Sequence, residues 1–174
     1  MKTLLTLLAL FLVTQLQAQL LVSPIDAMKE SYGSSATISK KNILLTKDKF
    51  KAIQKNARVK LETKIYRIFT AKKDKKVLGY GILINKKVRS KNAVVLYFIS
   101  DNTLKSIEIV AFNEPREYMP TQKWNSQFKG IKTDIKLELN RDIPSISGAT
   151  LSARTVTDGS RVAFALYNEI LKDK

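Results

Sequence analysis

The alternation of apolar and polar residues predicts a mainly extended middle region in this chain of 174 residues. Four segments alternate at two-residue spacing or are rich in β-branched and aromatic residues, and they begin at Val59, Val77, Ala93 and Leu104. The links between them are short and polar, and Asp101–Asn102 is a strong turn signal. Antiparallel hairpins are therefore the simplest connection between these strands.

Helical spacing flanks the strands on both sides. Ser23, followed by Pro24 at the first helical position, predicts a short helix. Residues 45–57 predict a second helix, with Thr46 as its cap. Apolar residues at three- and four-residue steps predict a last helix from about Ser152 to the C-terminus.

The remaining segments carry weaker patterns. Residues 23–40 are weakly patterned apart from the short helix, and residues 113–131 are polar and interrupted by proline. Residues 133–139 alternate again, as in a strand. The expected fold class is α+β, with a curved antiparallel sheet, a helix before it, and a C-terminal helix following the Ser147–Thr150 loop.

The first eighteen residues have the order of a secretory signal. Lys2 precedes an apolar run from Leu4 to Val13, and a polar stretch then ends at Ala18. The run is shorter than the roughly 20 residues that a membrane span needs. We expect a signal peptide over residues 1–18 and one domain over 19–174, exported to the periplasm or the outer face of the cytoplasmic membrane. An uncleaved anchor is the alternative.

Composition limits the available chemistry. The chain has no cysteine and no histidine, which excludes disulfides, thiolate metal sites and cysteine nucleophiles and removes the commonest general base. No metal site is expected, and any redox role must use a bound cofactor. The net charge of +16 favours anionic partners, although the export signal makes nucleic acid an unexpected one.

The stretch "SISGATLSARTVTDG" concentrates hydroxyl groups in front of the last helix. Gly148 allows backbone conformations closed to other residues, and Ala149 adds little bulk. Thr150 is expected at the exit of a tight turn, just before a helix whose first N–H groups favour phosphate. Arg154 could add a forked anion partner. The alternative is that Thr150 or Ser152 is an ordinary helix cap.

Ser147-Gly148-Ala149-Thr150 resembles the Ser/Thr-Gly-Ala-Thr/Ser signature of FMN-binding domain proteins. This family includes the flavin-carrying extracytoplasmic subunits of the sodium-pumping NADH:quinone reductase and of the Rnf complex. The upstream segments "VLGYGILINKK", "SDNTLKSIEIVAFNEP" and "PTQKWNSQFKG" are similar to the family's motifs in the same order, so the resemblance covers about residues 75–170.

The resemblance implies an exported flavoprotein that carries FMN as a phosphoester on Thr150. A magnesium-dependent flavin transferase would attach the FMN from FAD, and the protein would carry electrons to or from a membrane or exported redox partner. It would act as an electron carrier rather than a stand-alone enzyme, and no catalytic residue is expected. The implied cofactor-binding residues are Thr150, Ser147, Gly148, Ala149, Leu151, Ser152, Arg154, Thr155, Glu114 and Trp124.

Several of these residues have a second interpretation. Ser152 and Thr155 could be caps, Glu114 could cap a loop, and Trp124 with Tyr118 and Phe128 could pack in the core instead of walling a flavin.

Two positions depart from the family pattern. Pro144 stands where the family usually has aspartate, the nearest acid being Asp142, and no glycine follows Pro115 closely. These departures favour the alternative of a flavin-free extracytoplasmic binding or adaptor module. The net charge suggests a third class, an exported binder of polyanions.

Overall fold

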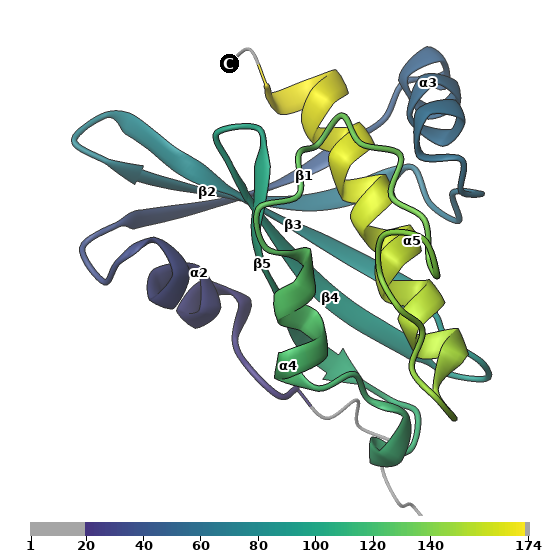
Figure 1. Cartoon of the computed structure of the whole chain (residues 1–174). Coiled ribbons are helices and arrows are strands. Elements are labelled where there is room, and N and C mark those ends of the chain that lie inside the picture. Colours follow the sequence, from purple (N-terminus) through teal and green to yellow (C-terminus); the bar gives the residue numbers. More distant parts are fainter. Residues whose placement is uncertain (1–19, 173–174) are drawn as a thin grey trace, which may run out of the picture.

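The structure is a computed structural model that describes residues 20–172, so the expected signal segment 1–18 lies outside the described residues. Its centre is one five-stranded antiparallel sheet in which each strand pairs with the next along the chain (Figure 1). The strands are β1 (Thr37–Leu44), β2 (Ile65–Lys73), β3 (Lys76–Lys87), β4 (Asn92–Ser100) and β5 (Thr103–Phe112).

Helices lie on both faces of the sheet (Figure 1). They are α2 (Pro24–Tyr32), α3 (Lys47–Ala57), α4 (Gln122–Asn125) and α5 (Thr150–Leu166), with 3-10 turns η1 (Arg116–Tyr118) and η2 (Ser126–Phe128) and a closing π-helical turn η3 (Tyr167–Leu171). The α+β class expected from the sequence is confirmed, with an antiparallel sheet between an early helix and a C-terminal helix.

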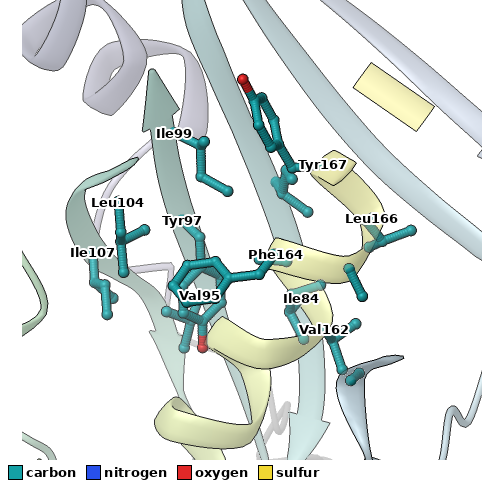
Figure 2. Close-up of a cluster of buried hydrophobic side chains, with 14 of the residues drawn as sticks. Ile84, Val95, Tyr97, Ile99, Leu104, Ile107, Val162, Phe164, Leu166 and Tyr167 are labelled. Carbon is teal, nitrogen blue, oxygen red and sulfur yellow. The ribbon is translucent and has the colours of Figure 1, made fainter. Parts of the chain in front are cut away.

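The sheet buries both of its faces, and β4 contributes to each. Val95, Tyr97 and Ile99 point to the core under α5, which Figure 2 shows together with Phe164 of that helix. Leu96 and Phe98 point to the smaller core under α2. A strand covered on both sides needs apolar residues at consecutive positions, which explains the uninterrupted run "AVVLYFI".

The first strand is a feature that the sequence pattern did not predict. Strand β1 pairs with β2 alone and lies at the edge of the sheet. Most of its side chains are exposed, and only Ile38 and Ile43 are partly buried, on opposite faces. The expected alternation is therefore missing, because an edge strand exposed on both faces needs no apolar stripe.

Two predicted extended segments are corrected. The strand expected from Val59 begins at Ile65. Helix α3 ends at Ala57, its C-cap Arg58 is left-handed (φ 52°), and the loop that follows buries the side chains of Val59 and Leu61. Residues 133–139 form a turn, an irregular stretch and a single bridge from Leu139 to Ile143 instead of a strand.

Thr133 shows how this second segment is held. Its N–H donates to the carbonyl of Asn102 at 2.9 Å, and its carbonyl accepts from the Asn168 amide at 2.9 Å. Both backbone groups of Thr133 are thus bonded to the β4–β5 turn and to η3. Leu137, fully buried, anchors the same segment in the core.

We predict that Gly159→Ala destabilises the fold, although alanine is normally about 1 kcal/mol better than glycine inside a helix. A methyl group at Gly159 would overlap the buried Tyr97 hydroxyl and would lie 2.8 Å from its Cζ atom. Overpacking of this kind costs about 1–3 kcal/mol. Urea unfolding measures the loss, which should be smaller when the same substitution is made in a Tyr97→Phe background. An equal loss in both backgrounds would contradict this explanation.

Candidate functional site

A cavity of about 260 Å³ lies at the start of α5. It joins the β3–β4 loop, the segment after β5 and the Gly148–Ser152 stretch, which are far apart in sequence. Its lining consists of Val88, Arg89, Glu114, Tyr118, Gly148, Ala149, Thr150, Leu151 and Ser152. Six of the ten residues expected at a flavin site therefore line one cavity.

Thr150 is the first residue of α5, so the helix begins two residues earlier than the pattern predicted and Thr150 lies in the helix instead of just before it. The first helical bond runs from the N–H of Ala153 to the carbonyl of Ala149 at 3.1 Å. No side chain caps the N-terminus. The N–H groups of the first turn are thus free of intrahelical partners at the cavity, where an anion would be favoured.

The Thr150 side chain is exposed. Its hydroxyl lies 3.4 Å from the carbonyl of Ile146, a long hydrogen bond that another partner could replace. The hydroxyl is therefore accessible both to a ligand and to a modifying enzyme.

Gly148 makes the turn that leads into this helix. Its φ of +75° lies in the left-handed region, and no heavy atom outside residues 147–149 lies within 4 Å of the position that a Cβ would take. Glycine is thus needed here for backbone conformation, and the space beside it is open. The next residue, Ala149, is buried and donates its N–H to the carbonyl of Ile146 at 3.0 Å, whereas Ser147 is exposed.

Glu114 holds the opposite wall of the cavity. Its carboxylate accepts hydrogen bonds from the backbone N–H groups of Lys91, Ser90 and Arg89 at 2.7, 2.6 and 3.1 Å. These bonds, that of Lys91 first, lower the pKa of Glu114 below its usual value. The side chain thus acts as a cap of the β3–β4 loop, one of the two roles expected for it, and also lines the cavity.

Trp124 lies outside the cavity lining. It is 8% exposed, stacks edge-on against Phe128 with 5.1 Å between ring centroids, and donates its indole N–H to the carbonyl of Pro144 at 2.9 Å. The indole thus supports the loop before the Ser147–Thr150 signature from the core side. Of the three aromatic residues considered for a flavin wall, only Tyr118 lines the cavity.

The remaining expected site residues on α5 have different surroundings. Ser152 is buried and lines the cavity, whereas Thr155 donates its hydroxyl to the carbonyl of Lys87 at 3.2 Å and joins the helix to β3. Arg154 is exposed and is not part of the lining. The arginine that lines the cavity is Arg89, an exposed residue of the short polar link between β3 and β4.

Asp142, the acid nearest to Pro144, is engaged elsewhere. Its carboxylate pairs with Arg141 at 2.8 Å and accepts the N–H of Glu138 at 2.8 Å, and these bonds lower its pKa. Asp142 therefore does not replace the aspartate that the family signature usually carries at the position of Pro144.

A larger cavity of about 550 Å³ lies between α3, α5 and residues 133–138, and none of the expected site residues lines it. Arg161 crosses it to donate to the carbonyls of Ala57 and Arg58 at 2.8 and 2.7 Å, which caps the end of α3. Within residues 20–172, no group of three or more His, Cys, Asp or Glu residues could hold a metal ion. No helix in that range is long and apolar enough to cross a membrane.

Comparison with known proteins adds no relative to this picture. No family model matches the chain, and no curated protein matches it. The site is thus defined by its residues and their geometry.

We predict that Glu114→Gln destabilises the protein most near neutral pH. A carboxyl group with a lowered folded pKa contributes stability above its unfolded pKa of about 4.3, and that contribution is lost as the pH falls through the folded value. The difference in unfolding free energy between wild type and variant should therefore shrink below about pH 4. Urea unfolding at a series of pH values measures it. A difference independent of pH would contradict a role for the charge.

Proposed function

We propose that this protein is an exported flavoprotein that carries FMN as a phosphoester on Thr150 and transfers electrons between redox partners. The observation that carries the proposal is the cavity in which Glu114, from the Glu-Pro segment, meets the Gly148–Ser152 stretch. These two motifs belong to the ordered set that resembles the FMN-binding domain family. Although they are far apart in sequence, they line the same cavity, as two parts of one binding site would.

The lining suits the phosphate end of FMN. The free N–H groups at the start of α5 and the open space beside Gly148 favour a phosphate there, and Arg89 contributes a positive charge. The cavity is somewhat smaller than the roughly 300–1,000 Å³ of pockets that enclose a ligand. It would therefore cover a flavin only in part, with Val88 and Tyr118 as its apolar contacts.

Attachment needs an accessible hydroxyl, and Thr150 has one. In the proposed modification the Thr150 oxygen bonds to the flavin-side phosphorus of FAD. The phosphoanhydride bond breaks, AMP leaves, and the hydroxyl proton passes to the transferase or to solvent. The flavin then supplies the redox chemistry, which side chains without cysteine cannot provide.

The lining favours a carrier over a stand-alone enzyme. Its titratable side chains are Arg89, Glu114 and Tyr118, and the Glu114 carboxylate is already bonded to three backbone N–H groups. No acid–base pair for a small substrate remains in this lining. The proposed partners are a flavin transferase and a membrane or exported redox protein.

The first test is the intact mass of the exported protein. Co-expressed with an exported flavin transferase, the wild type should gain the mass of one FMN less one water, and Thr150→Ala should gain none. Thr150→Ser, which keeps the hydroxyl, should be modified at least in part. A transferase that modifies a control substrate but leaves the wild type unchanged would overturn the proposal.

The same experiment addresses the second candidate function, a flavin-free binding or adaptor module. Pro144 and the engaged Asp142 favour this alternative, because the family aspartate is missing. We expect Pro144→Asp to raise the modified fraction. If the wild type and Pro144→Asp both remain unmodified, the flavin-free module becomes the better assignment.

We predict that Arg89, and not Arg154, contributes to phosphate recognition. In the Thr150→Ala background, Arg89→Gln should weaken non-covalent FMN binding by roughly three- to tenfold, as expected for one partly solvated charge-assisted hydrogen bond. Riboflavin, which lacks the phosphate, should bind with the same affinity whether or not the Thr150→Ala background also carries Arg89→Gln. Arg154→Gln removes the same charge outside the cavity lining and serves as the control. Fluorescence titration measures the affinities, and equal effects of the two substitutions would contradict the prediction.

A further inference from the structure

Half of the net charge of the chain lies in one corner of the molecule. Residues 40–67 carry ten basic and two acidic side chains, a net charge of +8 out of +16 for the whole chain. They form most of β1, all of α3 and the start of β2. Figure 1 shows α3 beside the ends of these two strands, and we call residues 40–67 the basic corner.

Helix α3 turns a row of lysines to solvent. Ile53 and Ala57 are buried against the rest of the protein, whereas Lys47, Lys51 and Lys55 follow at four-residue steps and are exposed. Four-residue spacing places the three on one side of the helix. Within the part of the chain that the structure describes, none of them forms a salt bridge. Their charges are therefore available to an external anion.

Two aliphatic side chains are exposed in the same corner. Leu44 is 70% exposed and Ile65 is 57% exposed, and the two face each other across the ends of β1 and β2. Leu44 lies three residues before Lys47, and Ile65 follows Lys64 directly. A single exposed aliphatic residue is ordinary, but a cross-strand pair close in sequence to exposed lysines combines the two features that interfacial membrane binding uses.

We propose that the basic corner docks on a membrane surface that contains anionic phospholipids. Its lysines contact the headgroup phosphates, and Leu44 and Ile65 enter the boundary with the acyl chains. Lysine heads on flexible stems suit a fluid surface, which presents no fixed arrangement of charges. The site is separate from the flavin cavity, since no residue of the basic corner lines it.

The test compares vesicles of phosphatidylcholine with vesicles that also contain phosphatidylglycerol. The protein purified after export should sediment only with the second kind. Substituting Lys47, Lys51 and Lys55 together with Gln should lower the partition coefficient by about 100-fold at low salt. The matched control replaces Lys72, Lys73 and Lys76 with Gln, which removes the same charge from exposed positions at the β2–β3 hairpin. This control should have a much smaller effect.

A second variant separates membrane docking from adsorption by charge alone. Leu44→Asn with Ile65→Asn keeps every charge and should lower the partition coefficient by about tenfold, because two aliphatic side chains no longer leave water. Circular dichroism establishes that each variant is folded. The proposal is overturned if the wild type binds neither vesicle, if both lysine variants lose equally, or if the aliphatic variant binds like the wild type. The last result would mean that the protein adsorbs to the vesicles by charge alone.

Discussion

The close approach of α5 to the sheet is the constraint on which the candidate site depends. The buried Tyr97 hydroxyl donates to the carbonyl of Val156 at 3.0 Å, and Gly159 provides the space that lets the helix come so near. Burial raises the pKa of Tyr97 well above its ordinary value, so this hydroxyl stays protonated and remains a donor. Thr155 adds a bond to β3. The first turn of α5 therefore has one fixed position relative to the β3–β4 loop.

The opposite wall of the cavity, at the β3–β4 loop, is held by the charged carboxylate of Glu114 and not by apolar packing. Glu114 accepts hydrogen bonds from three backbone N–H groups of the β3–β4 loop. A carboxylate can satisfy several donors at once, and an apolar side chain at this position would leave them without those bonds. The cavity is thus formed between a helix fixed by a buried hydroxyl and a loop fixed by a buried carboxylate.

Local signals explain which elements the sequence predicts well. The starts of α2 and α3 are set by Ser23 and Thr46, whose hydroxyls accept the N–H three residues ahead, so both helices are readable from adjacent residues. Strand β1 is not readable in this way, because its only reason to be extended is the distant pairing with β2. The same holds for the start of residues 133–139, because Thr133 bonds to the distant Asn102 and Asn168.

The candidate site likewise has features that local sequence predicts and features that depend on tertiary structure. The Gly148–Thr150 turn follows from residue types, since a left-handed glycine before a helix is a local choice. The positions of Arg89 and Trp124 required tertiary structure, because they depend on how the β3–β4 loop lies against the start of α5 and how α4 lies against the loop at Pro144.

A small, open cavity and a covalent attachment are physically consistent. Binding energy comes from the ligand surface that leaves water, and a cavity of about 260 Å³ removes only part of a flavin from solvent. Such a site would hold free FMN weakly, and an exported protein would lose it by dilution. A phosphoester on Thr150 removes this dependence on affinity, so the lining needs only to orient the group. The uncovered part of the flavin would then be the part that a redox partner can approach.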